Sequence, residues 1–494
     1  MLAKLDLSNF KSFSSLTNFA VTPITVLCGT NSSGKSSILQ SLLLTKQSFE
    51  SQGNDQIVLL NGKLVHLGNL KNIIHSNDSG RTLKISHIFK LTSDDVKIIR
   101  SLRQSRLPLM VILRDLMPKQ FAQNSGENNF TVKFEICLKN LETSDAAQPP
   151  KVVIESLLFT IDVENNGQFV EGPRVEMQHK AGNQYNLKWT NLSSRHHPNG
   201  ETATDGDTSC QAVFANLLPL SVRMPDSSPA NERFDPYLFS RIRDILRLLT
   251  TNYSYIGPLR EEPARRYIYE DEVLEIGVKG ENAAFVYLKE KGRVVRGQYV
   301  MSKDGETFEQ CASESLGDAV RRWFNFLGID DFQTETNNEL IQLTHRASCE
   351  TPTRVNIADS GFGISQVFPI IVEGMRISPG TSLILEQPEI HLHPRMQMQL
   401  ADFFITLGLS SKRVILETHS DHIINRLVRR IIEDKDGRLR NMISIYFVRP
   451  SPVGTYLEKI NVDPKKGITN WPDEFFDQTA TEQERIMRAI SQNR

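Results

Sequence analysis

The residues with the clearest chemical signal lie near the start of the chain, in the stretch VLCGTNSSGKSSILQSLLL at positions 26–44. Gly29, Gly34, Lys35 and Ser36 satisfy the spacing GxxxxGK[ST], in which glycines let successive backbone N–H groups curl around phosphates. The alternative is a Gly/Ser turn that caps an ordinary helix. We expect ATP and Mg²⁺ to bind here. The predicted cofactor-binding residues are Asn31, Ser32, Ser33, Gly34, Lys35, Ser36 and Ser37.

Two strand-like runs near the other end of the chain are each followed by a polar tip and a helix: SLILE-QPE at 382–389 and VILE-THSD at 414–421. In an α/β sheet both tips would lie at the carboxyl edge of the strands, where ligands bind. We expect Glu386 to hold Mg²⁺ through water opposite Ser36. Gln387 would orient an attacking water, and Glu389 would take its proton. His419 would hydrogen-bond a γ-phosphate.

A third candidate segment is NIADSGFGISQVFPIIVEGM, in which a Gly-rich turn opens a helix about twenty residues before Glu386. Exposed amides and serines at a helix start bind anions. One chain does not need two such starts for a single phosphate chain, so we expect a dimer in which this turn closes over the nucleotide of the other subunit. The residues are Ser360, Gly361, Gly363, Ser365 and Gln366, and either serine satisfies the spacing.

The elements that position these residues follow from the hydrophobic pattern. The fold class expected is α/β, with a first strand and turn over 2–13 and a strand over 24–28 leading into the loop helix that begins at Gly34. Further strands are predicted over 57–68 and 83–91 and a mainly β section over 130–190, whereas 193–209 reads as a polar surface loop. Helices are predicted over 95–121, 234–249 and 313–329, with Trp323 and Phe326 in the core.

Composition sets limits on the class of protein. The chain has 494 residues and a formal net charge of −1, so no global basic field indicates nucleic acid. Its five cysteines show no zinc spacing, which suits a reducing cytosol. No apolar run approaches 18 residues, so we expect a cytoplasmic protein without a membrane span. His196 and His197 read as a solvated pair rather than a metal site.

Two basic clusters are candidate anion contacts. Arg260, Arg265 and Arg266 fall in YSYIGPLREEPARRYIY, where an ordinary solvated basic turn is the alternative. The second cluster could meet DNA phosphates, although such a run is more often a solvated helix face. Its residues are Arg426, Arg429, Arg430, Lys435, Arg438 and Arg440.

The chain resembles the ATP-binding-cassette class of ATPases, in the branch that contains RecF, the SMC proteins and the OLD-type ATPases. LDLSNFKSF, GTNSSGKSS, SGFGISQ, EQPEIHLHP and ETHSD resemble the first strand, Walker A, signature, Walker B with D-loop and switch-histidine motifs, in that order. GITNWPDEFFDQ at 467–478 and GPLREEPARRY resemble bacterial ATPases of antiphage defence operons, such as Septu-like systems, which act beside a separate nuclease. The likeness is strong at both ends and poor over 90–240.

The resemblance implies an ATPase head with an insertion in the middle of the chain. We expect an N-terminal lobe with Walker A over 1–90, an insertion over 91–255 and a linking region over 256–345. A C-terminal lobe with signature, Walker B and switch histidine follows over 346–450, and a tail over 451–494. Where most cassette ATPases have Asp-Glu, this chain has Glu386-Gln387. The usual catalytic base is absent, so turnover would be slow or nil.

Two functions remain open at this stage. The first is an ATP-dependent dimer or larger oligomer that scaffolds and regulates a separate nuclease effector in antiphage defence. Only 75 residues follow His419, too few for an appended OLD-type nuclease domain. The second is a RecF-like repair or recombination ATPase that clamps DNA through Arg426, Arg429 and Arg430. No heptad run is long enough for a coiled-coil arm.

Overall fold

The structure is a computed structural model, which describes most of the 494 residues. The described residues are 1–53, 56–78, 80–92, 95, 113, 116, 128–141, 151–165, 168–192, 204–225, 234–235, 237–268, 275–302, 304–337, 340–348, 351–472 and 478–492. The sequence-predicted helix over 95–121 and the pair His196 and His197 lie outside this part of the chain, apart from residues 95, 113 and 116.

A six-stranded sheet carries both the glycine loop and the two polar strand tips. Its order is β11-β20-β21-β3-β22-β23, and only the β22–β23 pair is antiparallel. The strands read as continuous apolar runs because both faces of a parallel sheet are buried. Their bounds are β3 Ile24–Gly29, β11 Tyr253–Ile256, β20 Ser382–Glu386, β21 Arg413–Glu417, β22 Ile443–Arg449 and β23 Tyr456–Ile460.

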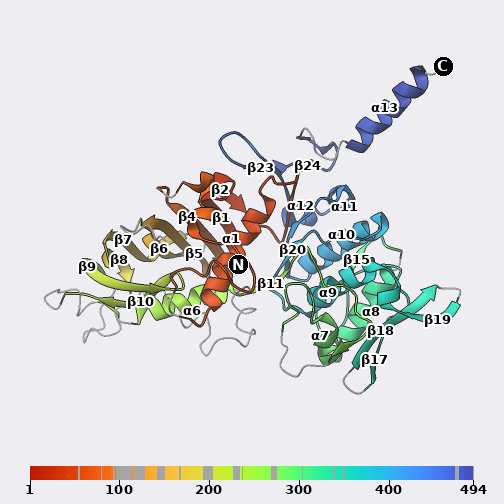
Figure 1. Cartoon of the computed structure of the whole chain (residues 1–494), viewed down its shortest axis with the longest axis horizontal. Coiled ribbons are helices and arrows are strands. Elements are labelled where there is room, and N and C mark those ends of the chain that lie inside the picture. Colours follow the sequence, from red (N-terminus) through yellow and green to blue (C-terminus); the bar gives the residue numbers. More distant parts are fainter. Residues whose placement is uncertain are drawn as a thin grey trace.

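The second sheet has nine antiparallel strands, in the order β10-β9-β8-β7-β6-β5-β4-β1-β2. The strands from the middle of the chain therefore extend the sheet that the N-terminal strands begin (Figure 1). The bounds are β1 Leu2–Phe10, β2 Phe13–Ala20, β4 Leu83–Leu91, β5 Asn128–Leu141, β6 Lys151–Asn165, β7 Gln168–Ala181, β8 Gln184–Leu192, β9 Thr204–Ala215 and β10 Leu218–Arg223.

Helix α1 (Lys35–Glu50) lies between the two sheets. Its apolar residues share a core with the nine-stranded sheet, with helix α6 (Leu238–Thr250) and with Ile384, Ile415 and Val448 of the six-stranded sheet. Thirteen of its sixteen residues are buried, so its polar side chains bond to main chain. The Ser41 hydroxyl donates to the Ile38 carbonyl, for example. The loop helix is thus held on nearly all sides.

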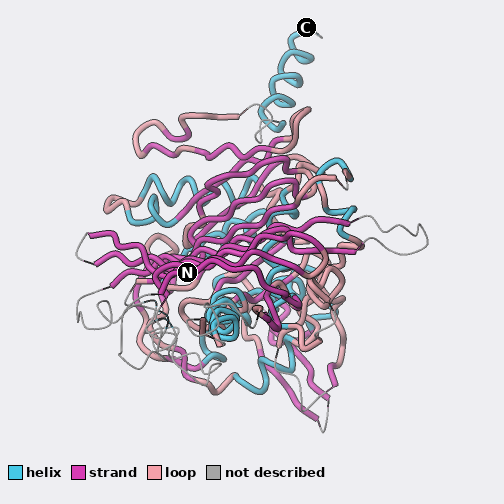
Figure 2. The backbone as a smooth tube through the Cα atoms, turned by 90° about the vertical axis from the view of Figure 1, so that its left-hand side faces the viewer, coloured by secondary structure: helices cyan, strands magenta, loops and turns pink. Residues whose placement is uncertain are grey.

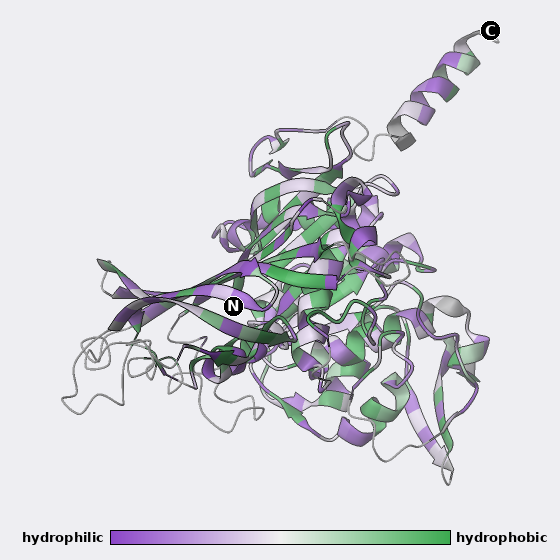
Figure 3. Cartoon of the chain, turned by 60° about the vertical axis from the view of Figure 1, so that its left-hand side comes forward, coloured by the Kyte–Doolittle hydropathy of each residue, from purple (hydrophilic) through white to green (hydrophobic). Residues whose placement is uncertain are grey.

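The other face of the six-stranded sheet is covered by helices. A second core joins strand residues to α7 (Ala283–Glu290), α8 (Leu316–Phe326), α9 (Phe362–Arg376), α10 (Pro394–Leu409) and α11 (Asp421–Glu433). Trp323 is 2% exposed and Phe326 packs against the same core, as predicted. Figure 3 shows hydrophobic residues gathered along the central strands. The mixed α/β class is confirmed.

The remaining elements are short or peripheral, and helix α13, with 15 residues, is the longest of them. Figures 1 and 2 show α13 projecting away from the body of the molecule. Among the described residues, no helix has the length and apolar character needed to cross a membrane. The other bounds are α2 Leu70–Ile73, β12 Tyr267–Ile268, β13 Val294–Val295, β14 Tyr299–Met301, β15 Phe308–Gln310, β16 Glu314–Ser315, β17 Gln333–Asn337, β18 Leu340–Ser348, β19 Thr351–Asn356, α12 Arg438–Met442, β24 Val462–Asp463, β25 Gly467–Ile468 and α13 Gln478–Gln492.

Two predicted segments are wrong. Residues 57–68 form a loop rather than a strand, because the buried Gln47 side chain accepts from the Val65 N–H and donates to the Leu59 carbonyl. Residues 204–209 belong to strand β9 rather than to a loop, because their main chain pairs with β8 along the ladder. The strands predicted over 83–91 and 130–190 and the helices over 234–249 and 313–329 are confirmed in type.

Candidate nucleotide-binding site

The glycine loop joins β3 to α1 in a conformation that requires its glycines. Gly29 and Gly34 have φ values of 145° and 103°, which L side chains rarely adopt. A Cβ at Gly34 would lie 2.1 Å from the Ser12 hydroxyl oxygen, and one at Gly29 would lie 2.5 Å from the Val448 carbonyl oxygen. The loop can therefore pack closely on its neighbours only with glycine at these two positions.

The loop presents groups that suit an anion. Lys35 Nζ curls over the loop and donates to the Thr30 carbonyl at 2.7 Å and the Gly29 carbonyl at 3.2 Å. Helix α1 has no side-chain cap at its N-terminus, and the buried Ser33 hydroxyl has no hydrogen-bond partner. A helix start with uncapped N–H groups beside an ammonium is a phosphate-binding arrangement. Asn31 and Ser32 are exposed at the loop tip.

The first polar strand tip places Glu386 beside this loop. Glu386 is 7% exposed, and Tyr255 Oη on the neighbouring strand β11 donates to its Oε1 at 2.8 Å. Burial and the nearby carboxylate of Glu417 raise the pKa of Glu386 to about 7, against the opposing effects of Tyr255 and Lys11. A carboxyl of this kind exchanges its proton readily for a metal ion near neutral pH.

The second tip contributes a residue that the sequence analysis did not select, Glu417. It is the last residue of β21, in register with Glu386 on one side and Leu27 on the other. The Ser36 hydroxyl hydrogen-bonds its carboxylate. The signal in the sequence was that SLILE and VILE both end in glutamate at the same sheet edge. Burial raises the pKa of Glu417, whereas Ser36 and Lys35 oppose that shift.

Glu389 and His419 lie together, as the sequence pattern predicts for adjacent strand tips. Glu389 Oε1 accepts from the main-chain N–H of His419 at 2.6 Å, and its buried Oε2 has no hydrogen-bond partner. Burial raises the pKa of Glu389. Burial and the Lys35 charge lower the pKa of His419, so its imidazole is neutral at pH 7. A neutral imidazole can donate one hydrogen bond and accept another.

Gln387 occupies a tightly fixed turn between these carboxylates. Its φ is 46°, and its main-chain N–H donates to the Glu417 carbonyl at 2.8 Å. Arg260 Nη2 donates to the carbonyls of Glu386 and Gln387 at 3.0 and 3.1 Å. Arg260 is 7% exposed, and burial lowers its pKa to about 10. Arg260 is therefore a support for the strand tip rather than the solvated basic turn considered above.

The signature-like turn lies at the start of α9 and exposes only part of its predicted set. Gly361 is exposed with φ 83°, and the half-buried Ser360 hydroxyl lies 2.6 Å from His345 Nε2. Gly363 approaches the segment after β20, since a Cβ there would lie 2.9 Å from the His391 carbonyl oxygen. Gln366 is buried, and its amide donates to the Glu261 carbonyl at 3.4 Å.

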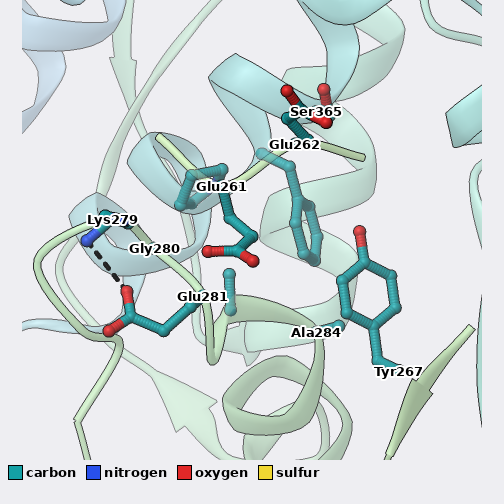
Figure 4. A pocket seen from close by; sticks show the side chains of 11 residues that line it. Glu261, Glu262, Tyr267, Lys279, Gly280, Glu281, Ala284 and Ser365 are labelled. Carbon is teal, nitrogen blue, oxygen red and sulfur yellow. Dashed lines mark hydrogen bonds between the residues drawn. The ribbon is translucent and has the colours of Figure 1, made fainter. Parts of the chain in front are cut away.

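Ser365 faces the interior of the subunit. It is 7% exposed and borders a small pocket whose lining includes Glu261, Glu262 and Glu281 (Figure 4). Three carboxylates outweigh the one ammonium of the lining, Lys279, so the charge of this pocket disfavours a phosphate. Of the two serines left open by the spacing, we therefore infer that Ser360, beside the exposed Gly361, is the one available to a nucleotide.

The basic run on α11 is largely engaged within the chain. Arg430 is 2% exposed and donates through Nε to Asp402 Oδ1 at 2.8 Å, so its predicted role in binding nucleic acid is wrong. Arg426 lies 3.6 Å from the same carboxyl group, and the exposed Arg429 pairs with Glu433 at 2.6 Å. Asp402 and the carbonyls of Gly305 and Glu306 therefore decide where Arg430 points.

The chain matches a known protein family. The model of a family described as AAA ATPase domain matches residues 1–197 and 305–424, which is more than half of the chain. The chain belongs to the AAA ATPase domain family. A second model, described as a protein of unknown function (DUF3696), matches residues 440–486 of this ATPase-family chain. No curated protein matches the chain.

Solved structures similar to this AAA ATPase domain include SMC heads. One is the SMC head domain from Thermotoga maritima, at 11% identity over 93% of this chain and 99% of that chain, with a TM-score of 0.36. Another is an SMC head bound to the C-winged helix domain of ScpA, at 11% identity over 93% and 98%, with a TM-score of 0.39. A third is an SMC head with an extended coiled coil bound to the C-terminal domain of ScpA, derived from Pyrococcus furiosus, at 9% identity over 99% of both chains, with a TM-score of 0.33. These likenesses are distant.

The oxygen atoms of Ser36 and Glu386 suit a Mg²⁺ ion that is also bound by phosphates. Among the described residues, no three His, Cys, Asp or Glu side chains converge as a metal site made of protein alone. Mg²⁺ is usually held by one or two carboxylates together with substrate phosphates. Ser36 and Glu386 at the edge of the glycine loop match that pattern, and the buried unpartnered oxygens Glu389 Oε2 and Glu417 Oε2 leave acceptor capacity beside them.

The raised pKa of Glu386 has a measurable effect on stability in the absence of metal. With a pKa of about 7 in the folded state and 4.5 as the ordinary value, the folded state holds the proton more tightly. Ionisation of Glu386 therefore lowers the free energy of unfolding progressively as the pH rises from about 4.5 to 7. We expect Glu386→Gln to raise the free energy of unfolding in EDTA by up to about 3 kcal/mol at pH 8 and by little at pH 4.5.

Urea unfolding at the two pH values checks this expectation. The same substitution at the exposed Glu482 of α13 serves as the control and should leave the pH dependence unchanged. An equal or lower stability of Glu386→Gln at pH 8 would show that Glu386 is ionised at no cost in the folded protein.

Proposed function

We propose that this AAA ATPase-family chain binds ATP with Mg²⁺ and forms an ATP-dependent dimer or larger oligomer. The observation that carries the proposal is the convergence of Lys35 and Ser36 with Glu386 and Glu389 at one sheet edge, from segments more than 300 residues apart. The loop N–H groups and Lys35 would bind the phosphates, and Ser36 and Glu386 would hold the metal. Bound Mg²⁺ would neutralise phosphate charge.

The exposed turn at Ser360 and Gly361 supports the dimer. It places the start of a fifteen-residue helix that has no side-chain cap beside the Ser360 hydroxyl, which bonds to His345 and to the Asn356 carbonyl, and an uncapped helix start is an anion-binding arrangement. The glycine loop of the same chain already provides another such start at α1. We propose that the turn of one subunit contacts the γ-phosphate held by the loop of its partner, so that ATP binding and assembly are coupled.

The residues at the site favour slow hydrolysis. Gln387 has no proton-accepting carboxylate, whereas Glu389 has a buried free oxygen and lies next to the neutral His419. In the proposal Gln387 orients the attacking water, Glu389 accepts its proton, and His419 donates to the γ-phosphate. ATP would then act partly as an assembly ligand.

We further propose that the assembly scaffolds and regulates a separate nuclease in bacterial antiphage defence. The support is the resemblance of GPLREEPARRY and GITNWPDEFFDQ to ATPases of such systems. Within the former, Arg260 donates to the carbonyls of Glu386 and Gln387, so this motif contacts the end of β20 in the proposed nucleotide site. The RecF-like alternative has less support, because Arg430 is buried and Arg426 and Arg429 face carboxylates.

The test measures mass by light scattering with and without AMP-PNP and Mg²⁺, and then purifies the protein from its native operon. The proposal predicts nucleotide-dependent assembly and a co-purifying nuclease subunit. A monomer at saturating AMP-PNP would overturn the assembly. Tight DNA binding with a steep salt dependence and no nuclease partner would favour the DNA clamp instead.

A further inference from the structure

We propose that Glu417 is a second carboxylate of the metal site, acting on the bound cation together with Glu386 and Ser36. The inference rests on the proposed ATP and Mg²⁺ binding. Glu417 is the first residue of ETHSD, two positions before His419.

The main chain fixes Glu417 between the two halves of the site. Its carbonyl accepts from the Gln387 N–H at 2.8 Å on the β20 side. On the other side, the Thr418 N–H donates to the Leu27 carbonyl at 3.0 Å, next to the start of the glycine loop. Glu386 and Leu27 are its register partners in the parallel sheet. The main chain of Glu417 is therefore held firmly beside the glycine loop.

The Glu417 carboxylate has one oxygen without a hydrogen-bond partner. Glu417 is 4% exposed and hydrogen-bonded by the Ser36 hydroxyl, whereas its buried Oε2 has no partner. An unpartnered buried carboxylate oxygen is costly, and a cation beside it removes that cost. A hydroxyl has one proton and two lone pairs, so the Ser36 oxygen can bind a cation while it donates to Glu417.

The free oxygens of the carboxylates identify the ligand as a cation rather than another anion. Glu386 and Glu389 both lie close enough to Glu417 for charge repulsion, while Lys35 acts on Glu417, Lys11 on Glu386 and Arg260 on Glu389. The buried Oε2 atoms of Glu389 and Glu417 remain as acceptors without a hydrogen-bond partner. A divalent cation shared with nucleotide phosphates can bind such acceptors, and two carboxylates are within the number that Mg²⁺ accepts.

The test uses Mn²⁺ as an EPR-visible probe, titrated into protein that is saturated with AMP-PNP. Glu417→Gln keeps the shape and the Ser36 hydrogen bond but removes the charge. We expect Mn²⁺ affinity to fall about 10- to 100-fold, the usual effect of losing a carboxylate that supports a metal site. AMP-PNP affinity in EDTA should be unchanged or slightly tighter. The matched control is Glu433→Gln on α11, which removes the same charge from an exposed position.

A double-mutant cycle with Ser36→Ala separates this role from a general loss of fold. The two effects on Mn²⁺ affinity should be strongly non-additive, because both residues act on one cation. Glu417→Asp, which keeps the charge, should lie between Glu417→Gln and wild type, and it replaces Glu417→Gln if that variant does not fold. Wild-type Mn²⁺ affinity in Glu417→Gln or in Glu417→Asp, or additive effects, would overturn the inference. Absence of AMP-PNP binding by wild-type protein would instead overturn the proposed function.

Discussion

Lys35→Ala is expected to lower ATP affinity at least about 100-fold and to abolish ATP-dependent assembly. Lys35 Nζ now donates to the carbonyls of Thr30 and Gly29, and phosphate oxygens would replace these acceptors with charge-assisted hydrogen bonds. Losing two such bonds corresponds to about 3 kcal/mol or more, which is a factor of at least about 100. Isothermal titration with AMP-PNP and light scattering measure the two effects.

The Lys35→Ala variant is expected to remain folded, so a loss of AMP-PNP binding reports on the missing ammonium and not on unfolding. Lys35 is 3% exposed, and its ammonium hydrogen-bonds to the carbonyls of Gly29 and Thr30 instead of forming a salt bridge. Burial lowers the pKa of the ammonium, whereas Glu417 and Glu389 raise it, so the desolvation cost that its removal relieves offsets the lost attraction to these carboxylates. The exposed Lys71→Ala on α2 is the control for the loss of one positive charge. Retention of AMP-PNP binding and assembly by Lys35→Ala would mean that the glycine loop has no role in nucleotide binding.

Gln387→Glu is expected to raise ATP turnover at least about 10-fold. A positioned general base contributes about 100- to 10,000-fold, and the Gln387 amide cannot accept a proton. The gain is placed below that range because Glu386, Glu389 and Glu417 already crowd the site and would raise the pKa of a further carboxyl. Steady-state phosphate release at pH 8 with saturating Mg²⁺ and ATP measures it.

Two further variants show which residue acts as the general base. Gln387→Ala should show no gain, since it adds no base. Glu389→Gln should lower wild-type turnover but have little effect in the Gln387→Glu background, where the new carboxylate takes over. An unchanged rate in Gln387→Glu, together with loss of the basal rate in Glu389→Gln, would identify Glu389 as a sufficient base and contradict the assignment of slow turnover to Gln387.

The parts of the site that lie within one short motif were predictable from the sequence. The glycine loop and the strand tips at Glu386 and His419 depend on local spacing, because a parallel strand followed by a helix always exposes its carboxyl end at the same sheet edge. Glu417 was not selected, although it ends its strand as Glu386 does. The hydrogen bond with Ser36 depends on the register between β3 and β21, whose sequence positions differ by almost 400 residues.

The failures have similar causes. Arg430 looks like part of a solvated basic face, but Asp402 on the neighbouring helix α10 holds it in the core. Residues 57–68 alternate like a strand, but the Gln47 side chain takes up the main-chain groups that a neighbouring strand would pair. The polar start of β9 shows little β propensity, and its ladder with β8 decides its conformation. In each case a long-range partner overrides the local pattern.

The most direct test of the central claim mixes two defective subunits. In a dimer with two composite sites, Lys35→Ala lacks one half of each site, and Ser360→Asp opposes phosphate with a negative charge at the other half. A mixed dimer would contain one site with both halves intact. We predict that neither variant assembles alone with AMP-PNP and Mg²⁺, whereas the mixture forms dimers that hold one nucleotide each. A mixture that stays monomeric, or assembly of Ser360→Asp alone at wild-type nucleotide concentrations, would contradict a nucleotide shared between two copies of this chain.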